Sequence, residues 1–369
     1  MFIKRVQQLT EKLTDDQKTR VLVAALLHDV GHGPFSHVFE KVTGESHEKR
    51  TLEIIRDDHT DVHRRLVEFD KNLPEDLAIF FDEDVDEDSR IDSSLPVFLT
   101  QIVHSQLDAD RFDYLLRDSL STGTDYGNFD IGWLIQHLFI DEERRRFYLS
   151  RKAIMSAESY VFARYHMYRT VYFHKTTRAA EVMLRLLFRR FKDLLDNSEE
   201  KANIVQGAPS SIAKAFSGGM SLEDYLQLDD HTITEFLKAC LNASDSILSE
   251  LARGLLYRRL FKGTDVTNQA ASDIVRFTEG AKEAIKSAGR DPAYYFADDS
   301  AGDTPYKPYH PDSDEPNTQI YVDKTTELSD LSDPVDELRK KYILLRYYYP
   351  EDVRMKVEEV AAKTLKGAI

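Results

Sequence analysis

The sequence predicts a mainly α-helical protein with a smaller α+β part at its carboxyl end. Up to about residue 262, long stretches repeat apolar residues at helical spacing, and capping residues precede several of them. Beyond that point short apolar stretches alternate with turns rich in Pro, Asp and Ser, a pattern typical of short strands and loops. We therefore expect a helical core at residues 1–200, a helical extension at 201–262 and an α+β subdomain at 263–369.

The first helices lead into a turn rich in glycine and histidine. Residues 2–13 and 15–30 are predicted helices, and Thr14 followed by Gln17 predicts a capping box at the start of the second. The second helix contains seven consecutive apolar residues. Because a membrane span takes about 20 residues, we expect this helix to be buried within the protein. The glycines and the proline from Gly31 onwards then end it.

The later elements follow from helical spacing and turn chemistry. Helices are predicted at residues 46–55, 61–69, 95–119, 153–195, 232–241 and 246–260, with a bend near 174–176 and a last helix after Pro350. Residues 138–140 and 147–149 flank a polar turn and predict a hairpin. Small and polar residues at 208–219 predict a linker, and the apolar residues of 294–296 and 319–322 predict short strands.

Charge and cysteine usage exclude several classes of protein. The formal net charge of −16 argues against nonspecific coating of nucleic acid, because phosphate binding is mainly electrostatic. Part of the excess lies in the acidic run 81–88, an expected solvated loop. The single cysteine, Cys240, excludes an intramolecular disulfide and fits a cytoplasmic protein. The sequence shows no signal peptide, transmembrane stretch, Cys-x-x-Cys pair, Walker A loop or dinucleotide-binding glycine fingerprint.

The end of the second helix carries a candidate metal site. His28 and Asp29 are adjacent there, and a buried carboxylate is costly unless a cation or hydrogen bonds hold it. Imidazole and carboxylate groups are ligands for divalent metals, so we expect a third ligand from a distant helix. We select Asp110, because it shares one helical face with Tyr114 and Asp118 at i, i+4 and i+8. The alternative is a capped helix end with a structural histidine.

Three further histidines are candidates for acid–base chemistry. His32, His37 and His47 qualify because histidine alone has an unperturbed pKa near neutrality. Glu48 follows His47 directly and can orient its imidazole. A structural role for His37 remains an equal alternative.

A mixed cationic and aromatic stripe is the candidate phosphate-binding surface. Arg164, Tyr168, Tyr172 and Lys175 fall near one face of the long helix. Arginine suits phosphate groups because its planar fork donates two parallel hydrogen bonds. The alternative is that the tyrosines simply pack in a core, as tyrosines at this spacing commonly do.

Two motifs carry a family resemblance. The residues H-D-V-G-H-G-P-F-S-H at 28–37 resemble the core motif of the HD-domain metal-dependent phosphohydrolases, and in particular their dGTPase-like deoxynucleoside triphosphate triphosphohydrolase branch. The residues D-A-D-R-F-D-Y-L-L-R-D at 108–118 resemble the second metal-ligand segment of these enzymes. The resemblance covers roughly residues 2–262. It implies an HD-domain helical bundle that binds one divalent ion, with Mn, Mg, Fe, Ni and Zn left open.

The resemblance also implies a role for each candidate residue. Asp110 becomes a metal ligand, while His47 with Glu48 acts on the departing group. The residues that it places against the nucleotide are His32, Arg111, Tyr114, Asp118, Arg164, Tyr168, Tyr172 and Lys175. Either Tyr114 or Tyr172 would fill the space of a ribose 2′-hydroxyl.

One departure from the family pattern concerns the first metal ligand. The family carries a histidine on a helix upstream of the His–Asp pair, and no histidine precedes His28 in this sequence. Phosphate- and effector-binding residues that such enzymes carry near the amino terminus are also missing. We therefore expect weak metal binding and low hydrolysis for the chain as written.

The resemblance implies metal-dependent hydrolysis of a deoxynucleoside triphosphate to a deoxynucleoside and inorganic triphosphate. One alternative is a phosphodiesterase or nucleotidase on the same scaffold. Another is a catalytically weakened protein that binds nucleotides or supports oligomerisation. A nucleotide effector and a homo-oligomer, dimeric or tetrameric, are further expectations, whereas a membrane or nucleic acid is not an expected partner. The preferred base stays open.

Overall fold

The chain forms two compact units, each discontinuous in sequence. The computed structural model describes residues 1–10, 13–81, 97–143, 145–197, 204–217, 220–303, 319–339 and 342–366. Unit 1 is made from Met1–His32, Ser46–Val171 and Asp303–Tyr342, and unit 2 from Gly33–Glu45, Tyr172–Gly302 and Ile343–Ile369. Helices dominate and two small sheets accompany them, which confirms the predicted mainly α class with an α+β part. The domain division at residues 200 and 262 stays a prediction.

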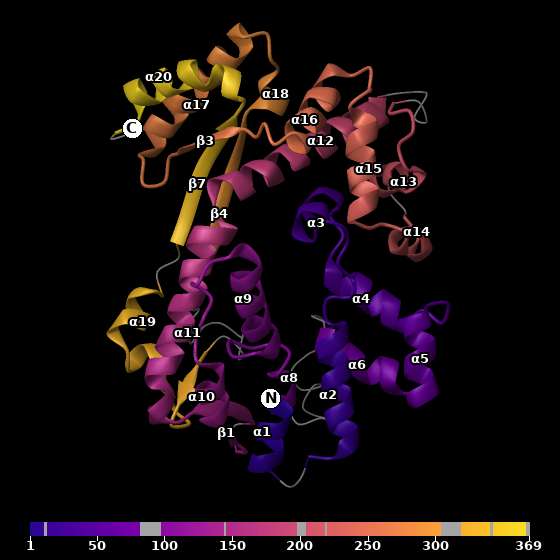
Figure 1. Ribbon diagram of the computed structural model, residues 1–369, viewed down its shortest axis with the longest axis vertical. Coiled ribbons are helices and arrows are strands. Elements are labelled where there is room, and N and C mark those ends of the chain that lie inside the picture. The colour runs from indigo at the N-terminus through magenta and orange to yellow at the C-terminus, as the bar shows by residue number, and fades with distance from the viewer. Residues whose placement is uncertain are drawn as a thin grey trace. The chain divides into compact units, whose positions relative to one another are not determined.

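Unit 1 is a set of short helices with one small sheet (Figure 1). Its helices are α1 (Phe2–Leu9), α2 (Asp15–Leu27), α4 (His47–Arg56), α5 (Asp61–Phe69), α6 (Leu73–Phe81), α8 (Val97–Thr100), α9 (Ala109–Thr122), α10 (Ile131–Gln136), α11 (Ile154–Met167) and α19 (Asp333–Glu337). Its strands, in the order β1-β2-β5-β6, are β1 (Leu138–Asp141), β2 (Arg146–Leu149), β5 (Tyr321–Val322) and β6 (Thr326–Glu327). The antiparallel pair β1–β2 confirms the predicted hairpin.

The predicted capping box begins α2. The Thr14 hydroxyl accepts a hydrogen bond from the backbone N–H of Gln17 at 3.1 Å, and the Gln17 side chain accepts one from the backbone N–H of Thr14 at 3.2 Å. These two bonds satisfy amide donors that a helix start otherwise leaves unpaired. The helix then runs to Leu27 and buries Val21 and Ala24, so the two residues that follow it are held at the edge of a packed core.

A buried arginine joins α2 to α6. Arg20 forms an ion pair with Asp16 within its own helix at 2.8 Å and with Asp70 just before α6 at 2.8 Å. It also pairs with Asp76 inside α6. Only 8% of the Arg20 side chain is exposed, so its charge depends on these three carboxylates for compensation.

Unit 2 packs shorter helices around one long amphipathic helix. Its helices are α3 (His37–Thr43), α12 (Lys175–Asn197), α13 (Ser210–Ser217), α14 (Leu222–Leu226), α15 (Asp230–Cys240), α16 (Ser246–Leu256), α17 (Ala271–Ser287), α18 (Pro292–Tyr295) and α20 (Arg354–Thr364). From α12, Leu187, Phe188 and Phe191 enter the core and meet Phe216 and Phe236. A π-helical turn, Tyr168–Tyr172, separates α11 from α12 close to the predicted bend.

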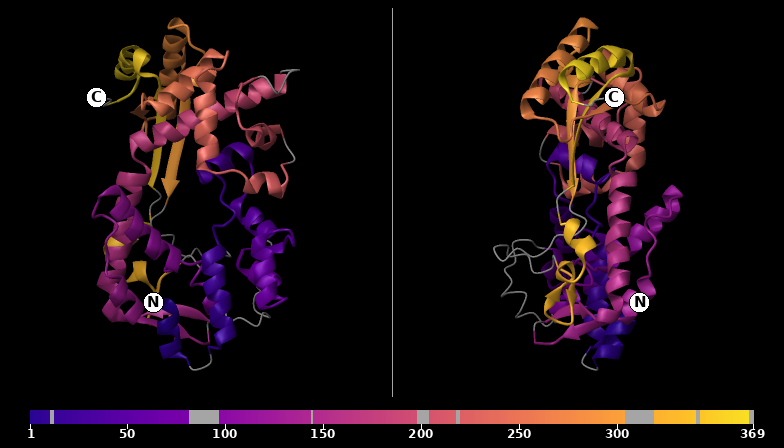
Figure 2. Two further views of the ribbon diagram at one scale, coloured as in Figure 1. Left: turned by 45° about the vertical axis from the view of Figure 1, so that its right-hand side comes forward. Right: turned by 90° about the vertical axis from the view of Figure 1, so that its left-hand side faces the viewer.

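The sheet of unit 2 has the strand order β3-β7-β4. Its strands are β3 (Lys262–Asp265), β7 (Tyr342–Tyr349) and β4 (Ala297–Asp303), of which β4 and β7 run side by side in Figure 2. β3 pairs antiparallel with β7, from Lys262↔Tyr349 to Asp265↔Arg346. Residues more than 80 positions apart therefore share this sheet, although the sequence pattern around β3 alone gives little sign of a strand.

Three predicted elements were wrong in their details. The helix expected at 95–119 is two helices, α8 and α9, separated by turns that end where Asp108 caps α9. The linker expected at 208–219 contains α13, because Ile212 and Phe216 lie one helical turn apart and pack into the core. The strand expected at 294–296 falls largely in α18, which Pro292 begins. In each case tertiary packing or a cap outweighed the local pattern.

Two further expectations concern the acidic run and membrane-spanning helices. The acidic run 81–88 lies, apart from its first residue, outside the described residues. Among the described residues, no helix combines the length and the apolar character that crossing a bilayer requires.

Replacing Arg20 by Met should destabilise unit 1. The substitution leaves three carboxylates clustered without their cation, which we expect to lower the free energy of unfolding by roughly 2 kcal/mol or more. Thermal unfolding of the purified chain measures this. The matched control is Arg64→Met, because Arg64 is 55% exposed and pairs with Asp61 on the surface of α5, where an ion pair contributes about 0–1 kcal/mol. Equal melting temperatures for the two variants would contradict the anchoring role of Arg20.

Candidate functional site

The site begins in the turn that follows α2. His28 ends the helix and Asp29 follows it, and the turn closes when the backbone N–H of His32 donates to the carbonyl of Asp29 at 3.0 Å. Gly31 lies at the centre of the turn. A Cβ atom at that position would lie 2.1 Å from the carbonyl oxygen of His47 and 2.4 Å from the backbone nitrogen of Thr51. Only glycine therefore allows the turn to approach the start of α4 this closely.

Thr51 holds the turn in place. Its side chain is fully buried, and its hydroxyl accepts a hydrogen bond from the N–H of Gly31 at 3.0 Å. The same hydroxyl donates to the carbonyl of His28 at 3.3 Å. One side chain on α4 thus fixes the backbone of both the first predicted ligand and the central glycine.

The structure brings the three predicted metal ligands together. Nε2 of His28 lies 3.4 Å from Oδ2 of Asp29 and 3.5 Å from Oδ1 of Asp110, near the start of α9. One candidate ligand atom from each residue lies within 4.8 Å of those of the other two. Nδ1 of His28 donates to the carbonyl of Ala25 at 3.0 Å, which leaves Nε2 directed toward the two carboxylates.

The electrostatics of this cluster fit a divalent cation. The Asp110 carboxylate, helped by that of Asp29, raises the pKa of His28 to about 9, and the same contact lowers the pKa of Asp110. Nε2 of His28 is buried and makes no hydrogen bond of acceptable geometry in the described part of the chain. A buried ring nitrogen facing two carboxylates is a donor set that suits Mn, Fe, Ni or Zn, and less well Mg.

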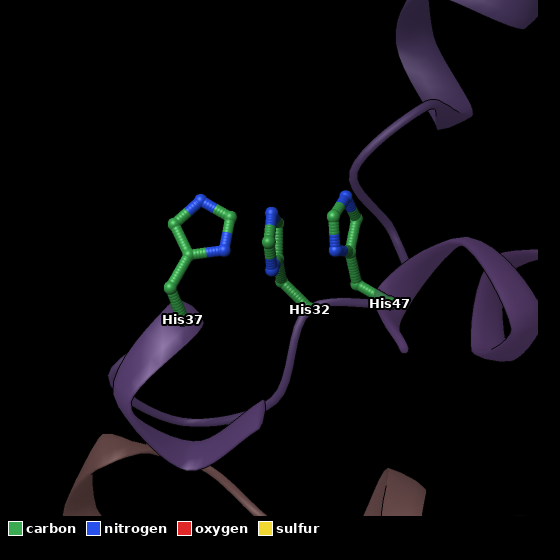
Figure 3. Close-up of side chains that lie close together, drawn as sticks. All are labelled: His32, His37 and His47. Atoms are coloured by element: carbon green, nitrogen blue, oxygen red, sulfur yellow. The ribbon is translucent and has the colours of Figure 1, made fainter. Parts of the chain in front are cut away.

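Two histidine rings lie against each other beside the ligands. Figure 3 shows the rings of His32 and His47 stacked face to face. Their centroids are 3.9 Å apart and their planes are inclined by 14°. Nε2 of His47 lies 3.2 Å from Oε1 of Glu48, and Nε2 of His32 lies 3.6 Å from Oδ1 of Asp29. Glu48 therefore stands where it can orient the His47 ring. Ser46 accepts from the N–H of Lys49 and caps the helix that carries both residues.

A cavity of about 350 Å³ opens over these groups. Its lining consists of His28, Asp29, His47, Glu48, Phe80, Phe81, Val103, His104, Asp108, Asp110 and Arg111. All of these residues belong to unit 1. Ligands, the acid–base candidate and one predicted phosphate-binding arginine thus share one cavity with an aromatic wall.

Arg111 is held against the cavity by the cap of its own helix. Asp108 accepts from the backbone N–H of Arg111 at 2.7 Å, and its Oδ2 lies 3.2 Å from Nε of Arg111. Burial raises the pKa of Asp108 to about 6. The buried Arg164 of α11 lies behind, with its guanidinium carbon 5.5 Å from the centre of the Tyr168 ring.

Asp110, Tyr114 and Asp118 share one face of α9, as predicted. These three residues are all partly buried, whereas the neighbouring Asp113 and Arg117 are exposed and pair with each other at 3.0 Å. Burial raises the pKa of Tyr114, so its hydroxyl stays protonated at neutral pH. The contact of Tyr114 and Asp118 with a nucleotide stays a prediction.

Three predicted site residues belong to unit 2. His37 begins α3, is 67% exposed, and its Nδ1 lies 2.9 Å from Oε2 of Glu40. Tyr172 ends the π-helical turn. Lys175 lines a separate cavity of about 390 Å³, together with the cationic side chains of Arg258, Lys262 and Arg354 and other residues of unit 2. The roles of these three residues at the site in unit 1 stay predictions.

Four residues near the site were not predicted from the sequence. Thr51 and Gln106 carry no recognisable motif, and the first was seen only as part of an amphipathic helix. His104 lines the cavity, although no motif marks it. Asp108 caps α9 and also reaches the cavity. Its position immediately before a helix was the available signal.

Comparison with known proteins places the chain in a family. An HD domain model matches residues 3–75, and an HD associated region model matches residues 129–367, more than half of the chain. A crystal structure of a phosphohydrolase from Bacteroides thetaiotaomicron superposes with a TM-score of 0.74 at 29% identity, over 95% of this chain and 85% of that one. The chain belongs to the HD-domain phosphohydrolase superfamily.

Relatives of this HD phosphohydrolase occur among bacteria and vertebrates. The protein YwfO of Bacillus subtilis is 35% identical over 345 residues, which cover 92% of this chain and 75% of YwfO. The deoxynucleoside triphosphate triphosphohydrolase SAMHD1 of Danio rerio is 26% identical over 299 residues, which cover 72% of this chain and 46% of the zebrafish protein. The matched region thus spans less than half the length of SAMHD1.

Replacing Gly31 by Ala should disrupt the turn that follows α2. The added Cβ would overlap the backbone of α4, and we expect the free energy of unfolding to fall by roughly 1–3 kcal/mol, together with a loss of bound metal. Thermal unfolding and elemental analysis measure the two effects. The control is Gly132→Ala in α10, where the nearest atom to the new Cβ is 3.5 Å away. A Gly31→Ala chain that keeps the stability and metal content of the wild type would show that the approach to α4 is not needed.

Replacing Asp110 by Ala should empty the metal site without unfolding the chain. The substitution removes one of three converging ligands, and losses around a metal commonly cost about 10–100-fold in affinity. Metal content by elemental analysis and a divalent-ion titration measure the change. Asp113→Ala is the matched control, because Asp113 lies on the exposed face of the same helix. Full metal occupancy in Asp110→Ala would remove Asp110 from the site.

Proposed function

We propose that this HD phosphohydrolase hydrolyses deoxynucleoside triphosphates to a deoxynucleoside and inorganic triphosphate. The observation that supports the proposal most directly is the cavity of unit 1, in which His28, Asp29 and Asp110 converge next to His47 and Arg111. The likeness of the 28–37 and 108–118 motifs to triphosphohydrolases and the name of the SAMHD1 relative support the substrate class.

Each residue of the cavity has a distinct task in this reaction. A divalent ion held by His28, Asp29 and Asp110 would polarise the α-phosphate and activate a water molecule. His47 donates a proton to the departing 5′ oxygen of the sugar, and Glu48, 3.2 Å away, keeps the imidazole oriented. His32 stacks on His47 and limits the movement of its ring.

The polyphosphate binds on the cationic side of the cavity. The Arg111 guanidinium is partly exposed to the cavity and can donate two parallel hydrogen bonds to phosphate oxygens. Tyr114 is a candidate for excluding a ribose 2′-hydroxyl, since it lies on the same helical face as Asp110 one turn further along. Arg164, Tyr168, Tyr172 and Lys175 remain proposed phosphate and sugar contacts.

The alternatives differ from the proposal in their products. A nucleotidase or phosphodiesterase on the same scaffold would release orthophosphate or a nucleoside monophosphate. A catalytically weakened chain would bind nucleotides and release little product. A homo-oligomer, a nucleotide effector and a cytoplasmic location are further proposals, and the cationic cavity of unit 2 offers a surface on which an anionic effector would find complementary charge.

Product analysis tests the proposed reaction. With dGTP and Mn²⁺ we expect equal amounts of deoxyguanosine and inorganic triphosphate, and much slower turnover of GTP. His47→Ala should lower the rate about 10²–10⁴-fold, because general acid catalysis contributes that much, while metal content stays unchanged. His59→Ala is the control, since His59 is 89% exposed on a surface turn. Release of orthophosphate, or of nothing at all, would contradict the proposed reaction.

A further inference from the structure

We propose that Gln106 is a positioning residue that presents Arg111 and Arg164 as a pair of cations to the phosphate chain of the substrate. No sequence motif and no family match assigns this residue a role. The inference deepens the proposed function, because it rests on a polyphosphate as the ligand of the cavity in unit 1. It concerns charge and orientation and assigns no chemical step to Gln106.

The geometry of the two arginines carries the inference. Oε1 of Gln106 accepts a hydrogen bond from Nη1 of Arg111 at 2.9 Å and another from Nη1 of Arg164 at 2.9 Å. Arg111 comes from α9 and lines the cavity, whereas Arg164 comes from α11 and is 6% exposed. Two guanidinium groups from different helices therefore converge on one neutral oxygen atom.

Gln106 itself is firmly fixed. It is 5% exposed, and its backbone carbonyl accepts a hydrogen bond of 2.6 Å from the hydroxyl of Tyr160, which is fully buried in α11. The turn that contains Gln106 ends two residues later, where Asp108 caps α9. A fixed acceptor restricts both guanidinium planes, so less side-chain entropy is lost when a ligand binds to them.

The neutrality of Gln106 is the informative property. Two like charges held close together repel each other, and a structural role alone would favour an acidic residue between them, which would form a buried ion pair with both. A glutamine has the length and shape of a glutamate but does not cancel the charge. Even with Asp108 ionised beside Arg111, the set of Gln106, Asp108 and the two arginines carries a net positive charge.

Such an arrangement suits a polyanion more than a neutral ligand. A guanidinium carries five N–H donors; each arginine gives one of them to Gln106, and Arg111 also pairs with Asp108. The dipole of the glutamine oxygen holds the two cations without adding a second carboxylate, so a phosphate group can pair with them more strongly than it could if residue 106 were acidic. Arg164 then acts on the substrate through the field and orientation that it shares with Arg111.

The test compares four variants by calorimetric titration with inorganic triphosphate, using the full chain with the metal that it retains on purification. Arg111→Ala identifies the part of the binding that belongs to this cavity, as opposed to the cationic cavity of unit 2. Gln106→Glu adds a negative charge without changing size, and Gln106→Leu removes the acceptor without adding charge. Gln101→Glu is the matched control, because Gln101 is also buried in unit 1 but accepts from the backbone N–H of Phe147.

We expect Gln106→Glu to weaken triphosphate binding roughly tenfold or more, as charge-assisted hydrogen bonds of this kind allow. Its melting temperature should equal or exceed that of the wild type, because the new carboxylate pairs with two arginines. A purely structural role predicts the same melting behaviour but an unchanged affinity for triphosphate. Gln106→Leu should bind more weakly than the wild type but more tightly than Gln106→Glu, and Gln101→Glu should bind as the wild type does.

Three results would overturn the inference. They are wild-type affinity in Gln106→Glu, wild-type affinity in Arg111→Ala, and weaker binding in Gln106→Leu than in Gln106→Glu. If Gln106→Glu does not fold, unchanged affinity in Gln106→Leu decides against the proposal. The titration needs no hydrolysis, so a wild-type chain that binds triphosphate but leaves dGTP intact would refute the reaction and leave the role of Gln106 standing.

Discussion

The site depends on one close approach, between the turn after α2 and the start of α4. Gly31 has no side chain, so the backbone of His47 and Thr51 can approach it closely. A Cβ atom on residue 31 would overlap that backbone. The Thr51 hydroxyl then joins the two segments by bonding to the N–H of Gly31 and the carbonyl of His28. This single contact sets two candidate metal ligands, His28 and Asp29, against the candidate acid–base pair of His47 and Glu48.

The charges of the site are arranged locally and differ from those of the chain as a whole. The chain carries a net charge of −16, yet the cavity joins a cluster of metal ligands to a wall that contains Arg111. Each charged group is fixed by a partner that leaves its function intact. The carbonyl of Ala25 fixes the tautomer of His28, and the neutral Gln106 fixes Arg111 without cancelling its charge.

Elements that depend on residues close together in the sequence were predicted well. The capping box of Thr14 and Gln17, the bounds of α5 and the hairpin β1–β2 all depend on residues a few positions apart, and all were confirmed. The break between α8 and α9 and the helix α13 were missed, because caps and core contacts made elsewhere decided them. Gln106 was missed for a related reason. Its role depends on hydrogen bonds from two arginines on different helices, which no local pattern reveals.

By itself the sequence determined the types of group at the candidate site. The motif that begins at His28 and the one that contains Asp110 specify imidazole, carboxylate and guanidinium groups, since the identity of a side chain is a local property. Only the tertiary structure decided that α2 and α9 bring His28 and Asp110 to 3.5 Å, and that Thr51 and Gln106 hold the others in place. Such distances depend on packing between segments far apart in the chain, and no short stretch of sequence contains that information.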